Sequence, residues 1–223
     1  MTALHEAFFA FHHRAMHVPR VQRIARSLSA QIGRARSLLD VGCGDGTVAR
    51  DVATRVGAER VRGVDVKVRP GTSIEVLSYD GVHLPFDDGA FEAVILADVL
   101  HHAKDPGAVL RESLRVASRV VAVKDHFQFG WASQKILLFM DVVGNAGPAV
   151  EVRGTYFTPA SFIDLVTAAG GRITALQWPL QIHDYPWRIV TRDALQFAAR
   201  VESTSEKSTA PSALRAALAH DGG

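Results

Sequence analysis

Apolar residues near the start of the chain recur at every third or fourth position, which is the spacing of one face of a helix. Four residues between positions 4 and 18 fit it: Leu4, Phe8, Phe11 and Ala15. Pro19 interrupts the pattern, and a second helix is expected after it. This helix would turn four residues inward, namely Val21, Ile24, Leu28 and Ile32, and three arginines outward, namely Arg20, Arg23 and Arg26.

Further along, short apolar runs alternate with segments of helical pattern. Five runs are predicted to be strands: Ser37–Val41, Arg60–Val66, Ser73–Tyr79, Phe91–Ala97 and Arg119–Lys124. Helices are expected at residues 47–56 and 106–117, the latter beginning with Asp105 as N-cap before a proline. Because parallel strands require a long crossover, this alternation favours an α/β fold with a doubly wound, mostly parallel sheet.

The order is less regular after residue 124. Helices are predicted at residues 131–143 and 158–169, and strands at residues 172–178 and 187–191. From residue 203 the chain is polar and rich in Ser, Thr and Pro, which is typical of a mobile tail. We therefore expect one domain over residues 1–202, with an N-terminal helical cap at about residues 1–35, and a tail at residues 203–223.

Composition and charge exclude several classes of protein. The 25 basic and 23 acidic side chains nearly cancel, so nucleic acid is not an expected partner. The single cysteine, Cys43, allows no internal disulfide, and the chain has neither an uncharged signal-peptide core nor an apolar run of membrane-spanning length. A cytoplasmic protein without stable membrane insertion is expected. His13 and His17 have ligand-like spacing but no third ligand nearby, so no metal site is expected.

A glycine-rich loop follows the first predicted strand and precedes a helix. The loop, Gly42-Cys43-Gly44-Asp45-Gly46, lets the backbone approach a ligand while the helix directs free N–H groups to the same place. A nucleotide-like ligand is therefore expected. Thr47 stands in the sixth position, where the dinucleotide-binding fingerprint has a small residue, usually glycine.

Acidic residues stand at the ends of the first four predicted strands. Asp65 ends the second strand, where a carboxylate can accept hydrogen bonds from both hydroxyls of a ribose. Asp40 precedes the glycines and is expected either to hold the loop or to lie near the amino-acid part of a ligand. Asp80 follows the third strand and is a candidate acceptor for an adenine amino group, and Asp98 follows the fourth.

Together these segments resemble the class I S-adenosylmethionine-dependent methyltransferases, in particular the type 11-like group. The resemblance is carried by Leu38–Gly46, Asp65, Asp80–Phe86, Phe91–Val94 and Val99–His102. It implies a seven-strand-type, Rossmann-like sheet and S-adenosyl-L-methionine as cofactor. The cofactor-binding residues that it implies are Asp40, Gly42, Gly44, Gly46, Asp65, Asp80 and Gly81, with Asp98 and Val99 near the transferable methyl group.

The predicted function is methyl transfer to a small-molecule acceptor, which the sequence does not identify. Such an enzyme mainly aligns the acceptor and excludes water, but a base helps if the acceptor is a hydroxyl or an activated carbon. The candidate catalytic residues are His126, His102 and Asp125, with His101 beside them. His126 is the first choice, because Asp125 stands next to it and is able to orient the imidazole.

Two other functions remain open. The chain is also compatible with a noncatalytic S-adenosylmethionine-binding module. A nicotinamide-dependent reductase is disfavoured by Thr47 and by the absence of a Tyr-x-x-x-Lys pair. DNA methylation is disfavoured because Asp98-Val99-Leu100-His101 stands where amino-methylating enzymes carry a Pro-Pro-Tyr motif. The oligomeric state and the methylated atom, oxygen, carbon or nitrogen, are not defined by the sequence.

Overall fold

The structure is a computed structural model that describes residues 18–144, 155–183 and 193–205. The helix expected at residues 4–18 lies outside these ranges except for its last residue, and so does the strand expected at residues 187–191. Most of the expected tail, residues 206–223, is likewise outside them.

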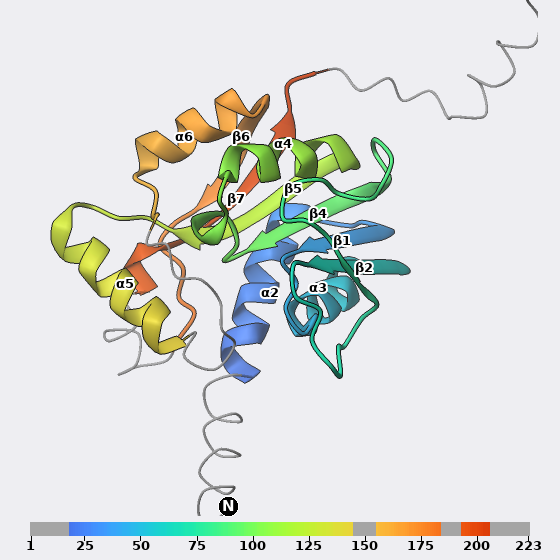
Figure 1. Cartoon of the computed structure of the whole chain (residues 1–223), viewed down its shortest axis with the longest axis horizontal. Helices are drawn as coiled ribbons and strands as arrows, with labels where there is room; N and C mark the ends of the chain where they lie inside the picture. Colours follow the sequence, from blue (N-terminus) through green and yellow to red (C-terminus); the bar gives the residue numbers. More distant parts are fainter. Residues whose placement is uncertain (1–17, 145–154, 184–192, 206–223) are drawn as a thin grey trace, which may run out of the picture.

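A seven-stranded sheet forms the centre of the molecule (Figure 1). Its strands are β1 (Ser37–Val41), β2 (Arg60–Asp65), β3 (Val76–Ser78), β4 (Phe91–Ala97), β5 (Ala117–His126), β6 (Gly171–Gln177) and β7 (Gln196–Ser203). Their order is β3-β2-β1-β4-β5-β7-β6. Neighbouring strands are parallel except at β7, which is antiparallel to both β5 and β6. The predicted doubly wound, mostly parallel α/β sheet is therefore confirmed.

Helices cover both faces of the sheet (Figure 1). They are α2 (Val18–Ile32), α3 (Thr47–Val56), α4 (Pro106–Val116), α5 (Trp131–Gly144) and α6 (Pro159–Ala168). Residues of α2 and α3 share one apolar core with one face of the sheet, and residues of α4 and α6 share a second core with the other face. Two short 3-10 helices, η2 (Leu100–His102) and η3 (Asp193–Leu195), complete the described elements.

The inward face of α2 agrees with the sequence pattern. Ile24, Leu28 and Ile32 are at most 1% exposed and pack in the core between α2, α3 and the sheet. This helix therefore forms part of a layer on the sheet. Its arginines are less uniform than expected, because Arg26 is exposed whereas Arg20 and Arg23 are partly buried and make hydrogen bonds.

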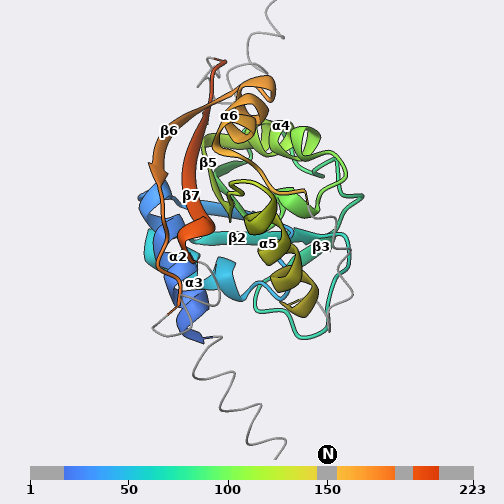
Figure 2. The same ribbon diagram turned by 90° about the vertical axis from the view of Figure 1, so that its left-hand side faces the viewer.

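The topology sets where a ligand can bind. β1 and β4 lie side by side at the middle of the sheet, and the chain leaves β1 towards α3 on one face and approaches α4 on the other after β4. Such a switch point opens a crevice at the carboxyl ends of the strands. Figure 2 shows α5 in front of the sheet at this end, directly after β5.

The structure differs from the predicted elements at three strands. β3 covers only Val76–Ser78 of the strand predicted at Ser73–Tyr79. β5 continues two residues beyond Lys124, so that Asp125 and His126 belong to a strand and not to a following loop. β7 occupies residues 196–203, for which no strand was predicted. Within the described ranges, the membrane prediction has one direct check: no helix combines the length and the apolar character that crossing a bilayer demands.

Candidate functional site

The glycine loop between β1 and α3 has a backbone conformation that side chains would disturb. Gly42 and Gly46 have φ angles of 72° and 74°. A Cβ atom on Gly42 would lie 2.7 Å from Cγ2 of Val99, and one on Gly46 would lie 2.5 Å from Cγ1 of Ile74. The loop is therefore packed directly against the segment that follows β4 and against the chain before β3.

Asp65 joins the glycine loop to the end of β2. Its Oδ2 accepts a hydrogen bond from the N–H of Gly44 at 2.8 Å, and its Oδ1 accepts one from the N–H of Lys67 at 2.9 Å. Two backbone donors thus fix the orientation of the carboxylate. A carboxylate has about four acceptor positions, so Asp65 keeps capacity for two hydroxyl groups of a ligand.

Asp40 lies at the inner side of the same loop and is only 2% exposed. Its Oδ1 has no hydrogen-bond partner among the described residues. Burial, followed by the neighbouring carboxylates of Asp65 and Asp45, raises the pKa of Asp40 well above its ordinary value. A buried acceptor of this kind is satisfied most directly by a donor that a ligand brings, and a cationic amine would also restore its charge.

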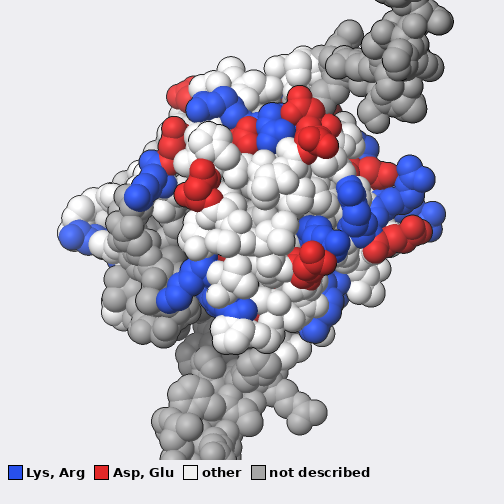
Figure 3. Space-filling view, turned by 45° about the vertical axis from the view of Figure 1, so that its right-hand side comes forward, with Lys and Arg blue, Asp and Glu red and all other residues white. Residues whose placement is uncertain are grey.

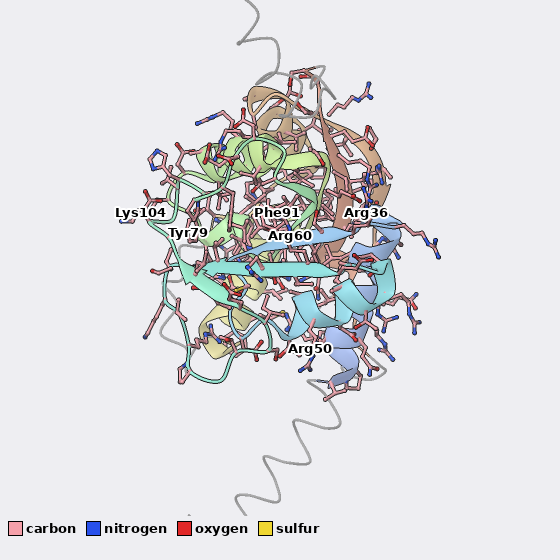
Figure 4. The ribbon with its side chains drawn as sticks, turned by 90° about the vertical axis from the view of Figure 1, so that its right-hand side faces the viewer. Arg36, Arg50, Arg60, Tyr79, Phe91 and Lys104 are labelled. Atoms are coloured by element: carbon pink, nitrogen blue, oxygen red, sulfur yellow. The ribbon has the colours of Figure 1, made fainter. Side chains whose placement is uncertain are left out.

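Asp80 uses both carboxylate oxygens within its own loop. Oδ1 accepts from the N–H groups of Val82 and His83 at 2.8 and 2.7 Å, and Oδ2 lies 2.8 Å from His83 Nδ1. These contacts, above all the side-chain bond with His83, lower the pKa of Asp80 to about 2. Tyr79 and Lys104 lie at the side of the sheet where the strands end, opposite Arg36 (Figure 4). Gly81, next to Asp80, has a φ of 88°.

Asp98 lies just beyond β4 and is the one non-glycine residue with positive φ, 59°, in the described ranges. Its Oδ1 is 2.6 Å from Nζ of Lys124, and its Oδ2 is 3.2 Å from a guanidinium nitrogen of Arg20. Burial raises the pKa of Asp98, but the nearby cations, Lys124 first, outweigh it and hold the pKa below its ordinary value. The ion pair with Arg20 connects the first turn of α2 to the mouth of the site.

A buried group of histidines and acids lies beside Asp98, at the ends of β4 and β5. His101 and Asp125 have side chains that are 1% and 0% exposed, and His101 Nδ1 lies 2.6 Å from Asp125 Oδ1. The same oxygen accepts from the backbone N–H of His126. Asp125 thus binds His101, whereas His126 Nδ1 stands 3.7 Å away from it. Asp125 was expected to orient the imidazole of His126, but its close side-chain contact is with His101.

The charges in this group follow from burial and pairing. Burial lowers the pKa of His101, but Asp125 and then Asp141 and Asp98 outweigh burial and raise the pKa to about 10. Burial alone would raise the pKa of Asp125. The neighbouring His101 outweighs burial and holds the pKa of Asp125 below its ordinary range. His101 and Asp125 therefore form an ion pair at neutral pH.

His102 and His126 differ from His101 because neither has a carboxylate as close as the 2.6 Å of the His101–Asp125 pair; the Asp98 carboxylate lies 3.5 Å from His126 Nδ1. Burial and then the His101 cation lower the pKa of His102. Burial and then Lys124 lower the pKa of His126. Both imidazoles are neutral near pH 7, and Nδ1 of each lacks a hydrogen-bond partner among the described residues. Neutral imidazole is the form that accepts a proton or binds a metal ion.

Four residues of this region were not singled out from the sequence: Arg20 and Lys124 as partners of Asp98, and Asp141 and Tyr156 as neighbours of His101. The Tyr156 hydroxyl donates a hydrogen bond to Asp141 Oδ2. One signal was present in the sequence, because Lys124 directly follows the apolar run Val120–Val123 of a predicted strand. In the structure Lys124 is 0% exposed. A charged residue in a central strand usually has a partner.

The opposite edge of the sheet has different chemistry. A hollow there is lined by Arg60, Arg62, Pro85, Phe86, Asp87, Ala90 and Phe91. The Arg60 guanidinium covers the Phe91 ring at 4.5 Å, in the region where Figure 4 labels both residues. On the face shown in Figure 3, basic and acidic side chains alternate without a large area of either sign. None of the predicted site residues lines this hollow.

The residues at the carboxyl edge fit S-adenosylmethionine. This ligand carries ribose hydroxyls, an ammonium group and a sulfonium, all of which suit carboxylates. Asp65 is fixed by two amide donors, and Asp40 holds a buried acceptor atom without a partner. Gly42 lies against Val99, so the glycine loop lies next to the segment that follows β4.

Comparison with known proteins supports this assignment. Residues 39–119 match the family model described as a methyltransferase domain. Over 108 residues the chain is 34% identical to a sarcosine/dimethylglycine N-methyltransferase of Halorhodospira halochloris, covering 43% of this chain and 38% of the relative. Over 98 residues it is 30% identical to norajmaline N-methyltransferase of Rauvolfia serpentina, covering 38% of this chain and 33% of the relative.

The chain thus spans less than half of the length of these curated relatives. Among solved structures, it resembles a putative methyltransferase of Haloferax volcanii in complex with the Trm112 methyltransferase activator. The TM-score is 0.63 at 15% sequence identity, covering 91% of this chain and 97% of the other. At this identity the likeness concerns the fold.

Proposed function

We propose that this chain, which contains a class I S-adenosylmethionine-dependent methyltransferase domain, catalyses methyl transfer from S-adenosylmethionine to a small-molecule acceptor. One observation carries the proposal: Asp65 is held by two backbone amides at the mouth of the glycine loop, beside the buried and partnerless oxygen of Asp40. When bound, the cofactor supplies an electrophilic methyl group on a sulfonium.

The residues at the carboxyl ends of the strands bind different parts of the cofactor. Asp65 accepts hydrogen bonds from the ribose hydroxyls, and Asp40 faces the amino-acid part beside Gly42, Gly44 and Gly46. Asp80 and Gly81 border the adenine. The Asp80 carboxylate already binds Val82 and His83, so it accepts a hydrogen bond from the adenine only through its remaining lone pairs.

Asp98 and Val99 border the transferable methyl group. The positive φ of Asp98 turns the chain sharply after β4, and Lys124 and Arg20 hold its carboxylate. Because these cations neutralise Asp98, the mouth is not dominated by a bare negative charge. The remaining task of the protein is to align the acceptor and to exclude water.

His126 is the proposed general base. It ends β5 next to Asp98, its side chain is 10% exposed, and its Nδ1 has no hydrogen-bond partner within the described ranges. Asp125 acts indirectly. Its carboxylate lies 2.6 Å from His101 Nδ1 and holds the His101 ring, which packs edge-to-face against the His126 ring. His102 is the second candidate for the base.

The acceptor is a small molecule. The two curated relatives are named for the N-methylation of sarcosine and dimethylglycine and of norajmaline, all of them small molecules. A polar wall of histidines, carboxylates and the Tyr156 hydroxyl borders the proposed acceptor side, where it suits a compact polar acceptor.

The proposal is tested with S-adenosylmethionine that carries a labelled methyl group and a panel of small amines and hydroxy compounds. Wild-type protein is expected to incorporate label into at least one acceptor. With a hydroxyl acceptor, His126→Ala is expected to lower kcat by about 10²-fold or more while leaving cofactor affinity unchanged. If His126→Ala and His102→Ala both keep full activity over a pH series, the general-base role is wrong. Saturable cofactor binding without any transfer would indicate a noncatalytic binding module.

A further inference from the structure

Several buried polar atoms at the ends of β4 and β5 have no hydrogen-bond partner. Within the part of the chain that the structure describes, they include Nε2 of His101 and Nδ1 of His102, which follow one another on η2. The two imidazole rings are 4.0 Å apart between centroids. Buried polar atoms are almost always satisfied, so two such nitrogens side by side suit a ligand that contacts both.

A carboxylate from another element completes the group. Asp141 on α5 places its Oδ2 3.4 Å from His101 Nε2, but the two atoms are not aligned for a hydrogen bond. One ligand atom from each of His101, His102 and Asp141 falls within 4.8 Å of the other two. We propose that these three residues bind a divalent transition-metal ion.

The distances suit such an ion. Two ligand atoms that each lie about 2.1 Å from a tetrahedral zinc ion are about 3.4 Å apart, and His101 Nε2 and Asp141 Oδ2 have this separation. The ligand nitrogen of His102 lies within 4.8 Å of both atoms, so its side chain has to move closer when the ion binds. Two imidazoles and one carboxylate form a donor set for Zn²⁺, Fe²⁺ or Co²⁺, with positions left for water or an oxygen of a ligand.

The surroundings of these ligands are those of a metal site. A histidine that binds a metal through one nitrogen usually donates its other N–H to a carboxylate, as His101 Nδ1 does to Asp125 at 2.6 Å. A carboxylate ligand is usually hydrogen-bonded in turn, and Asp141 accepts from the Tyr156 hydroxyl. Binding would displace the proton from His101 Nε2.

A second group of four, Asp98, His101, Asp125 and His126, is also compact enough for a metal. It is less suitable, because Lys124 Nζ lies 2.6 Å from Asp98 Oδ1 and repels a cation. One oxygen of Asp125 is moreover committed to His101. The ion therefore belongs on the other side of His101, where it would tie η2 to α5. This site uses none of the proposed cofactor-binding residues, but it uses His102, the second candidate for the base, and so favours His126 as the base.

Metal binding is tested on the full chain after treatment with EDTA and removal of the chelator. Titration with Zn²⁺ alone, followed by calorimetry, is expected to give one site per chain, and Co²⁺ is expected to give the visible absorption bands of a site with nitrogen ligands. His102→Ala and Asp141→Asn should each weaken Zn²⁺ binding by more than 100-fold. Tyr156→Phe, which removes only the donor to Asp141, should weaken it by about 10- to 100-fold.

His83→Ala is the matched control, because His83 also forms an Asp–His pair but has a side chain that is 79% exposed. It should bind Zn²⁺ like wild type. Absence of stoichiometric binding by folded wild-type protein, or equal affinity in His102→Ala, Asp141→Asn and wild type, would overturn the proposal. Calorimetry with S-adenosylmethionine on the same metal-free sample separates this outcome from failure of the proposed function.

Discussion

Among single residues, Gly42 shows most directly how the loop depends on glycine. Gly42→Ala combines a left-handed backbone with a Cβ placed 2.7 Å from Val99. Gly33→Ala has the same backbone penalty, with φ at 72°, but its Cβ meets nothing within 4 Å. We expect Gly33→Ala to lower the free energy of unfolding by about 1–2 kcal/mol, and Gly42→Ala by about 1–3 kcal/mol more.

Urea denaturation of both variants measures this difference. Equal losses of stability would show that the contact between the loop and Val99 is unimportant. A larger loss in Gly33→Ala than in Gly42→Ala would contradict the described packing of the loop against the segment after β4.

Lys124 is the clearest case of a buried charge that depends on its partner. Lys124→Met removes the closest cation of Asp98 and leaves the partly exposed Arg20 as its remaining lysine or arginine partner among the described residues, so we expect a loss of about 3–5 kcal/mol in the free energy of unfolding. Asp98→Asn in the same chain removes the uncompensated charge, and asparagine tolerates the positive φ. The double variant should therefore be more stable than the sum of the single losses predicts. Strict additivity in chemical denaturation would contradict the pairing.

The pair of Asp80 and His83 gives a pH-dependent prediction. Asp80 has its pKa lowered from 3.8 to about 2 and His83 has its pKa raised above 6.5, mainly through their side-chain hydrogen bond. The contribution of Asp80 to stability is present above pH 3.8 and is lost as the pH falls towards 2. The contribution of His83 is complete below pH 6.5 and is lost as the pH rises through its raised pKa. The pair therefore contributes fully between these limits.

Titration of the His83 ring by NMR tests this pair. Asp80→Asn removes the negative partner, so the pKa of His83 should fall back towards 6.5. An unchanged pKa in Asp80→Asn would show that the hydrogen bond in this loop does not form in solution.

At this scale the sequence predicted the positions of the acidic residues better than their partners. Asp65 and Asp98 stand at strand ends, as expected from the alternation of strands and turns. The pairing of Asp125 with His101 joins residues 24 positions apart, and Lys124 meets Asp98 across 26 positions. Such contacts depend on the register between β4 and β5, which no local pattern specifies.

At the scale of elements, the start of α4 is both predicted and testable. Asp105 accepts a hydrogen bond from the N–H of Ala108 at 2.8 Å, ahead of a proline in the first turn. Asp105→Ala is expected to lower the free energy of unfolding by about 1 kcal/mol, whereas Asp105→Asn keeps a capping oxygen and should cost far less. Thermal or urea unfolding of both variants checks this order, and equal losses would contradict the cap.

The strands that sequence analysis located best are the ones with continuous apolar runs. β1 and β4 have the predicted bounds, because both are buried on two faces and follow clear turn signals. β7 was missed, since its sequence, Gln-Phe-Ala-Ala-Arg-Val-Glu-Ser, is poor in β-branched residues. It is a strand because it fills the space between β5 and β6, where tertiary pairing overrides local preference.

For the whole molecule, the sheet order explains why the site lies where it does. Parallel strands β1, β2, β3 and β4 all end at one edge, which brings Asp40, Asp65, Asp80 and Asp98 to the same side of the fold. The alternation of strands and helices was sufficient to predict this edge. The sequence also named the histidines and Asp125 at the ends of β4 and β5, but not their pairing or the approach of Asp141 and Tyr156, because α5 and Tyr156 reach this group from outside the predicted core motif.

The measurement that tests the central claim most directly is calorimetric titration of the folded protein with S-adenosylmethionine, S-adenosylhomocysteine and NADH, repeated on Asp65→Asn. The account predicts saturable binding of both sulfur compounds, no binding of NADH, and an affinity at least about 10-fold lower in Asp65→Asn, which loses charge-assisted hydrogen bonds to the ribose. Absence of binding by folded, ligand-free protein, or NADH bound more tightly than S-adenosylmethionine, would contradict it.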